Sequence, residues 1–431
     1  TMNLTEPQAG TDLAGIKTKA VRNGDHYLIS GQKIYITYGE HDMAENIVHL
    51  VLARTEEAPA GIKGISVFIV PKFIPNEDGS LGPANDVRCL SIEKKLGIKA
   101  SPTAVMQYGE NGGAVGYLVG AENQGLDIMF SMMNHARLAV GLQGLSISDR
   151  AYQQARAYAF DRVQGTPLEK GSGAPIVHHP DVLRSLTIMK AEIESMRALM
   201  ILGAASMDLA HGCDAEDRRS TRANLLIPII KGWMTERALE VTSQAVQVHG
   251  GMGFIEETGA AQHFRDARIL PIYEGTTAIQ ANDLVFRKTL RDGGAAVTEL
   301  INEIDTEMQE LTYHADDMVS ANANHMSRAV ETARKATAHI LAAANEPRRP
   351  AVNGVNYLML LGYLCGGWVM TRASYKALLQ KSDASANPSF MQAKLATSQV
   401  FMTHLLPQVH ALADVIMKGD NAVLAMDTDW L

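Results

Sequence analysis

The chain has 431 residues, of which 46% are hydrophobic and 20% are charged, a composition typical of a globular protein with about two to four domains. A net charge of −8 at pH 7 argues against a nucleic-acid or anionic-membrane partner. The cysteines Cys89, Cys213 and Cys365 lie far apart. Their spacing predicts neither a disulfide framework nor a zinc site, and it favours a reducing compartment.

The first part of the chain reads as β-structure. Short apolar runs alternate with Gly, Pro, Asn and Asp, and the absence of helical periodicity between them predicts a barrel or sandwich. The expected strands are HYLIS (26–30), KIYIT (33–37), IVHLVLA (47–53), ISVFIVP (65–71), AVMQY (104–108) and VGYLV (115–119).

From about Gln124 the apolar period becomes helical. Helices are expected near 181–211, 217–249 and 277–292, then near 295–345, 351–381 and 387–418. Pro347 and Pro350 are expected to separate the helices on either side of them. The uncharged run 351–370 approaches membrane-spanning length, but its asparagines and glycines favour a buried bundle helix.

The sequence thus predicts an α+β multidomain fold. Residues 1–120 would form a β domain, 121–292 a four-helix bundle and 293–431 a further helical extension.

The run PIYEGTTAIQ (271–280) holds a candidate catalytic carboxylate, Glu274, just before a helix. Thr277 and Gln280 have capping-box spacing. The helix dipole favours the ionised form of Glu274, whereas the apolar neighbours Leu270 and Ile272 favour the acid. Such a group can serve as a general base, although a glutamate before a helix is also commonly a solvated loop residue.

Three motifs carry a resemblance to one family. IYEGTTAIQ resembles the catalytic loop of the FAD-dependent acyl-CoA dehydrogenases, and LTEPQAGTD (4–12) and QVHGGMGF (247–254) resemble two further signatures in family order. The resemblance covers about residues 1–290 and implies a middle β domain followed by a four-helix bundle. The family's N-terminal helical domain is expected to be missing from this chain. The extension resembles that of the larger branch, which includes the 3-methylmercaptopropionyl-CoA dehydrogenases.

The resemblance also implies roles for individual residues. Glu274 matches the family's catalytic base. The expected flavin contacts are Thr5, Gly10, Thr11, Tyr35, Thr37, Arg162, Gln247, Gly251 and Thr276, and the expected substrate contacts are Thr11, Asn134, Arg137 and Gly275. Strand alternation places Tyr35 and Thr37 on one face, with Tyr35 where many relatives have Trp. Relatives often have Asp where Asn134 stands, and the Phe-Gly that usually follows Arg162 is not present here.

The implied function is oxidation of a saturated acyl-CoA to the trans-2-enoyl-CoA, with FAD as cofactor and no metal. We expect electron-transfer flavoprotein as acceptor, a homodimer or higher homo-oligomer, no membrane span, and a bacterial cytoplasmic or mitochondrial matrix location. Two alternatives stay open at this point. One is an acyl-CoA oxidase that uses dioxygen, and the other is a non-catalytic flavoprotein or assembly fragment of the same fold.

Overall fold

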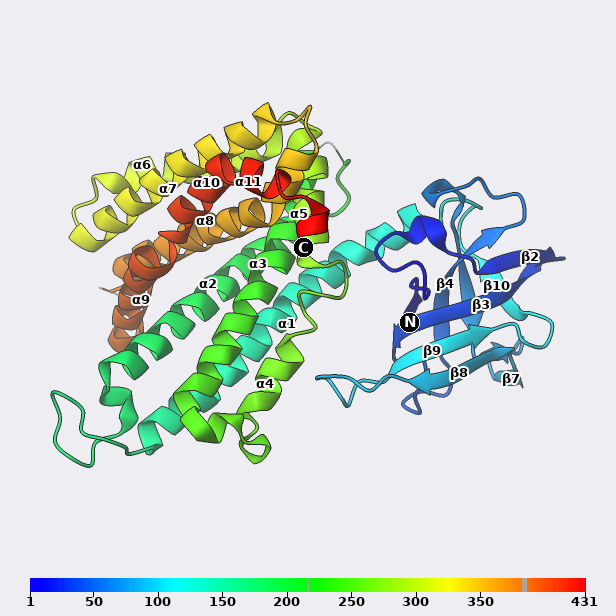
Figure 1. Cartoon of the computed structure of the whole chain (residues 1–431), viewed down its shortest axis with the longest axis horizontal. Helices are drawn as coiled ribbons and strands as arrows, with labels where there is room; N and C mark the ends of the chain where they lie inside the picture. Colours follow the sequence, from blue (N-terminus) through cyan, green and yellow to red (C-terminus); the bar gives the residue numbers. More distant parts are fainter. Residues whose placement is uncertain (216, 382–385) are drawn as a thin grey trace. The chain divides into compact units, whose positions relative to one another are not determined.

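The computed structural model describes residues 1–215, 217–381 and 386–431. The chain forms two compact units, Thr1–His135 and Ala136–Leu431. In Figure 1 the first unit carries the strands, coloured blue to cyan, and the second unit carries the helices, coloured cyan to red.

Strands dominate the first unit. They are β1 (Met2–Asn3), β2 (Lys19–Asn23), β3 (His26–Thr37), β4 (Val48–Thr55), β5 (Ser66–Pro71), β6 (Phe73–Pro75), β7 (Leu81–Ala84), β8 (Val87–Ile92), β9 (Thr103–Tyr108) and β10 (Ala114–Leu118). The main sheet has the order β1-β4-β5-β10-β3-β9-β8, and β6 pairs with β7 separately. Because β2 pairs with β3 on one side and β4 on the other, the strands β2-β3-β10-β5-β4 close into a ring.

The interior of this ring follows from strand alternation. Tyr27 and Ile29 point into the core from β3, and the Tyr27 ring lies 5.0 Å from that of Phe68 on β5. Gly31 is required where β3 passes close to the chain before β2, since a Cβ there would lie 2.6 Å from the Thr18 hydroxyl oxygen.

The predicted strands 26–30 and 33–37 are one strand, β3, which corrects the sequence interpretation. Gly31 and Gln32 were read as a break, but they continue the ladder opposite Tyr108 and Gln107. Strands β2 and β8 were not predicted. Both strands are largely exposed, and neither has the regular apolar alternation on which the prediction depended.

Helices make up the second unit. They are α1 (Gly125–Asp161), which begins in the first unit, α2 (Pro180–Ala210), α3 (Arg218–His249), α4 (Ala260–Ala267), α5 (Thr277–Asn282), α6 (Ala295–Thr312), α7 (Asp317–Ala342), α8 (Arg348–Gln380), α9 (Pro388–Val400), α10 (Gln408–Lys418) and α11 (Asp420–Leu424). Two π-helices, Asp283–Leu290 and Phe401–Leu405, continue α5 and α9. Short 3₁₀ turns are Leu13–Gly15, Ile62–Gly64, Ile176–His178, Gly250–Phe254, Glu256–Thr258 and Thr428–Trp430.

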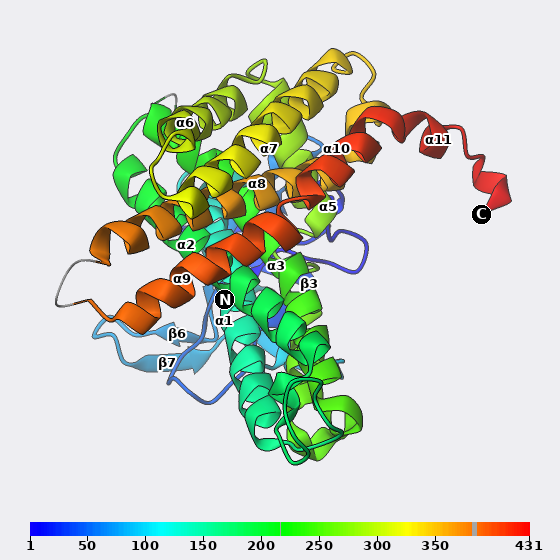
Figure 2. The ribbon, with the colours of Figure 1, turned by 90° about the vertical axis from the view of Figure 1, so that its left-hand side faces the viewer.

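Helix α8 is central to the second unit, where it packs against α2, α3, α7 and α10 (Figure 2). Gly362 on α8 lets Trp233 on α3 pack closely, since a Cβ at Gly362 would lie 2.2 Å from the indole. The prediction that 351–370 is a buried helix is therefore confirmed, because this stretch lies within α8 and most of it is buried.

Two helix boundaries were wrong. The stretch 295–345 is two helices, and Asp316 caps the second by accepting hydrogen bonds from Met318 N and Val319 N at 3.1 Å. Pro350 lies inside the first turn of α8, where its missing N–H costs no helical hydrogen bond.

Within the described ranges, one helical stretch, Pro388–Lys418, is long and apolar enough to cross a membrane by length and composition alone. A single stretch of this kind is weak evidence for a span, because core helices pass the same test.

Candidate active site

The loop before α5 holds the candidate base in an unusual backbone conformation. Glu274 has φ 53° and Gly275 has φ 88°, so two consecutive residues are left-handed. This conformation is unfavourable for a glutamate and persists where surrounding contacts impose it. The next turn begins α5, and Glu274 is therefore presented from a sharp, fixed bend.

Three hydrogen bonds hold the carbonyl groups of this bend. Lys231 Nζ on α3 donates to the Gly275 carbonyl at 2.6 Å, and Gln280 Nε2 on α5 donates to the carbonyls of Glu274 and Gly275 at 3.2 Å each. Thr277 N also donates to the Pro271 carbonyl at 3.0 Å, which ties the two ends of the loop together.

The predicted capping box is wrong by one residue. Thr276 is the N-cap, and its hydroxyl accepts from Ile279 N at 3.3 Å. Thr277 is the first helical residue, and its hydroxyl donates to Glu236 Oε1 at 2.5 Å. Gln280 does reach back from the first turn, but to loop carbonyls, because those carbonyls lie bent over the helix start.

Two opposing effects set the ionisation of Glu274. Burial raises the pKa of its carboxyl group, and the positive charges of Lys231 and Arg137 oppose this rise. Burial in turn lowers the pKa of Lys231 to about 8, against the stabilising charge of Glu274. The result is a carboxylate whose pKa lies above the ordinary glutamate value, as a general base requires.

Arg137 on α1 is buried, with only 6% of its side chain exposed. Its Nη1 lies 3.3 Å from Asp283 Oδ2 on the π-helix, and its Nε is a buried donor without a protein partner. This burial excludes the interpretation that Arg137 is an ordinary solvated surface residue. Contact with the substrate stays a prediction, as it does for Asn134, which is half-buried earlier in α1.

The predicted flavin face lies at the end of β3 in the first unit. Tyr35 is 62% exposed and Thr37 is exposed, whereas Ile36 between them is buried. The strand is irregular there, because Tyr35 has φ 60° and the register with β9 shifts between Lys33 and Ile36. Such a bulge re-aims side chains, and here it leaves a flat aromatic ring open to solvent.

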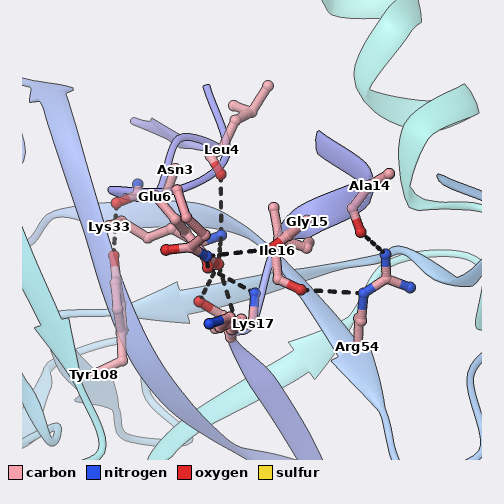
Figure 3. A network of polar contacts seen from close by, with 12 residues as sticks. Asn3, Leu4, Glu6, Ala14, Gly15, Ile16, Lys17, Lys33, Arg54 and Tyr108 are labelled. Carbon is pink, nitrogen blue, oxygen red and sulfur yellow. Dashed lines mark hydrogen bonds and ion pairs between the residues drawn. The ribbon is translucent and has the colours of Figure 1, made fainter. Parts of the chain in front are cut away.

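The loop before this face is fixed by a buried carboxylate, Glu6 (Figure 3). Glu6 accepts hydrogen bonds from Lys17 N at 2.6 Å, from Thr18 N at 3.1 Å, from the Thr18 hydroxyl at 2.6 Å and from Lys33 Nζ at 2.8 Å. Burial raises the pKa of Glu6, but the Lys33 charge and these hydrogen bonds outweigh it and bring the pKa to about 2.

This network connects the first motif to β3. Lys33 Nζ also donates to the Leu4 carbonyl at 3.1 Å, and Ile34 N donates to the Thr5 carbonyl at 2.9 Å. Thr5 is half-buried, while Gly10 and Thr11 are exposed beyond it. The predicted flavin residues of the first unit are therefore presented from one cross-linked loop and strand.

Arg162, Gln247 and Gly251 come together at the ends of two helices. Tyr158 near the end of α1 stacks on His249 at the end of α3, with ring centroids 4.6 Å apart. Arg162 and Gln247 are exposed, and the space beside Gly251 is open. The structure thus brings these three residues to one end of the bundle, where their cofactor contacts stay predictions.

The residues of the first unit fit a flavin, since an exposed aromatic ring, hydroxyl groups and an uncovered glycine can meet a flat polar ring. Tyr35, Thr37 and Gly10 supply these features. Among the residues that the structure describes, no group of three or more His, Cys, Asp or Glu side chains could hold a metal ion.

Comparison with known proteins gives the family. Residues 1–110 match the acyl-CoA dehydrogenase middle domain, 123–288 the acyl-CoA dehydrogenase C-terminal domain, and 300–427 an acetyl-CoA dehydrogenase C-terminal-like domain. The chain is 49% identical over 434 residues to 3-methylmercaptopropionyl-CoA dehydrogenase of Ruegeria pomeroyi, a match that covers 98% of this chain and 72% of that protein. The chain belongs to the acyl-CoA dehydrogenase family.

Solved structures of acyl-CoA dehydrogenases show the same fold. The Caenorhabditis elegans protein ACDH-11 in complex with C11-CoA has a TM-score of 0.80 at 22% identity, over 99% of this chain and 68% of that one. An acyl-CoA dehydrogenase of Bacillus anthracis complexed with FAD has a TM-score of 0.73 at 21% identity, over 100% and 69%. The family reaction is FAD-dependent dehydrogenation of an acyl-CoA to the enoyl-CoA, and this enzyme is a flavoprotein oxidoreductase.

Sequence reasoning missed the residues that support Glu274 and the flavin face. Lys231, Glu236 and Asp283 lie outside the recognised motifs. Glu6 lies inside the first motif and Lys33 in the predicted strand 33–37, and neither had an assigned role. One signal was available for Lys231, because a lysine inside the apolar run LLIPIIKGWM (225–234) must be buried and therefore needs a partner.

Proposed function

We propose that this dehydrogenase oxidises a short acyl-CoA whose chain carries a thioether, with Glu274 as the base. The observation that carries the role of Glu274 is its loop, in which a half-buried carboxylate with a raised pKa is held at a left-handed bend. The proposed substrate class follows the name of the Ruegeria pomeroyi relative at 49% identity.

The proposed chemistry assigns one task to each group. FAD, when bound, accepts the hydride that leaves the β-carbon as the double bond forms. The carboxylate of Glu274 takes the α-proton and becomes the carboxylic acid. Its backbone N–H is proposed to donate to the thioester oxygen, where negative charge develops during proton removal. Lys231 and Arg137 keep Glu274 ionised before the reaction, because both cations lower its pKa.

The substrate proposal can be tested with a matched pair of thioesters. 3-(Methylthio)propionyl-CoA and pentanoyl-CoA have acyl chains of equal length and differ by sulfur in place of one methylene. We expect kcat/KM to favour the thioether. A preference for pentanoyl-CoA would contradict the proposed substrate class without affecting the dehydrogenase assignment, which fails only when no acyl-CoA in a wider panel is oxidised.

We further propose that electron-transfer flavoprotein, and not dioxygen, accepts the electrons. The family resemblance supports this acceptor, and an acyl-CoA oxidase is the rival. Turnover should depend on added electron-transfer flavoprotein, with little oxygen consumption or peroxide release in its absence. Stoichiometric peroxide formation in air would instead identify an oxidase.

A homo-oligomer is also proposed, in which Arg162 reaches the FAD pyrophosphate of a neighbouring copy. Arg162, Gln247 and Gly251 support this proposal, because they gather at one exposed end of the bundle. Light scattering of the flavin-loaded protein would give its mass, and a monomer that holds FAD tightly would contradict the proposal.

A further inference from the structure

We propose that Lys231 is a positioning residue for Glu274, which it serves in two ways. Its ammonium group anchors the bend through the Gly275 carbonyl, and its positive charge keeps the Glu274 carboxyl group ionised. This inference rests on the proposed role of Glu274 as the base, and it gives a function to a lysine that is otherwise expensive to bury.

Lys231 lies in the middle of α3 and is 0% exposed. Lysines are almost never fully buried without a partner, because removing an ammonium group from water is costly. Its partner is the Gly275 carbonyl at 2.6 Å, a short charge-assisted hydrogen bond. The hydrogen bond to the Gly275 carbonyl therefore offsets the cost of burying Lys231.

The charges around Lys231 come from several elements. Glu274 in the loop and Glu236 on α3 stabilise its cation, and Arg137 on α1 destabilises it. On the π-helix, Asp283 raises the pKa of Arg137 and Arg287 lowers it.

Beside Lys231 and the start of α5, helix α8 contributes apolar contacts. Leu358 packs on Gly232, and Gly354 packs on Ala281 and Val285. Two cations thus act on Glu274, and Lys231 lowers its pKa more than Arg137 does.

The anchor and the charge have separate consequences. Glu274 has φ 53°, and the hydrogen bonds from Lys231 and Gln280 to the adjoining carbonyls hold this strained backbone. Loss of the anchor alone would let the loop relax, whereas loss of the charge alone would raise the pKa of Glu274. The two effects move the pKa of Glu274 in opposite directions, because exposure of a relaxed loop to water would lower the pKa that burial raises.

The test measures the ionisation of Glu274 directly and needs no turnover. The protein is labelled with carbon-13 at the glutamate carboxyl carbons, and the Glu274 signal is assigned by its loss in E274Q. In K231M the pKa of Glu274 should rise by about one unit or more, because an opposite charge nearby typically shifts a carboxyl pKa by about 1–3 units. K231R keeps a cation and should give a pKa closer to that of the wild type than K231M does.

Lys190→Met is the matched control. Lys190 lies on α2 of the same unit and pairs with Glu194 on its own helix, so its removal deletes one lysine charge away from the loop. The Glu274 pKa should be unchanged in this variant. An unchanged pKa in K231M, or an equal rise in K190M, would overturn the proposal.

A wild-type measurement covers the case in which K231M does not fold. Because burial lowers the pKa of Lys231 to about 8, the Glu274 signal is expected to show a second inflection as Lys231 loses its proton. K231R should lack this inflection, because its guanidinium stays charged. A flat signal between about pH 7 and 9.5 overturns the proposal. Failure of the proposed function would appear separately, as wild-type protein that no acyl-CoA reduces.

Discussion

Replacing Glu6 by glutamine tests how the flavin loop is held in the first unit. The change keeps the size of the side chain but removes the charge that faces Lys33, whose side chain is fully buried. The glutamine would retain one acceptor oxygen, for Lys17 N or for the Thr18 groups, because these donate to different oxygens of Glu6. The change thus removes hydrogen bonds on one side of the carboxylate, and it leaves the buried Lys33 without a counter-charge.

The magnitude follows from the pKa of Glu6, which is about 2 against an ordinary value of 4.5. At about 1.4 kcal/mol per pKa unit, this difference corresponds to roughly 3 kcal/mol of stabilisation at neutral pH. Because the folded pKa is depressed, this stabilisation is fully present above pH 4.5 and is lost as the pH falls towards 2. Breaking a buried pair typically costs about 3–5 kcal/mol, in agreement with this value.

Amide hydrogen exchange is the suitable assay for the first unit. Tryptophan fluorescence would not report on it, because Trp233, Trp368 and Trp430 all lie in the second unit. A loss of about 3 kcal/mol should speed exchange in β2, β3 and the preceding loop by about 100-fold or more at pH 7. The double variant E6Q/K33M should recover part of the protection, because it removes the unpaired charge. Equal protection in E6Q and wild type would refute the reasoning.

Three further predictions concern the second unit. Arg162→Ala should weaken FAD retention after dilution and desalting, since a cation opposite a pyrophosphate is lost; full flavin occupancy would show that Arg162 has another role. Gly275→Ala should lower kcat about 100-fold, because its Cβ would meet Gln280 Nε2 at 2.6 Å at a φ of 88° and displace the base; near-wild-type kcat would mean that the bend tolerates a side chain. The rate of flavin reduction should fall on the acid side with an apparent pKa above 4.5, since burial raises that of Glu274; stopped-flow rates unchanged down to pH 4.5 would contradict this.

Many strands and helices could be predicted from the sequence, because the patterns that indicate them are local. The apolar alternation around Tyr27 and Ile29 predicted a strand, and the helical period from Gln124 predicted the helix that begins at Gly125. The motif around Glu274 placed the base before a helix. The sequence left open whether the pKa of Glu274 is raised or lowered. In the structure it is raised, because burial outweighs the charges of Lys231 and Arg137.

The missed features depend on contacts between distant parts of the chain. Lys231 meets Gly275 across 44 residues and Lys33 meets Glu6 across 27, and no local pattern encodes such pairings. The capping residue was misplaced because Thr276 and Thr277 are adjacent and chemically equivalent. Only the fold decides that Thr277 turns to Glu236.

The most direct test of the account is flavin reduction by substrate in wild type and Glu274→Gln. The glutamine keeps the size and hydrogen-bonding ability of the side chain but has no basic oxygen, and FAD binding should survive. Anaerobic stopped-flow bleaching by the preferred acyl-CoA should slow by about 10²–10⁴-fold, the usual contribution of a positioned general base. Bleaching at the wild-type rate in the glutamine variant would contradict the central claim that Glu274 removes the α-proton.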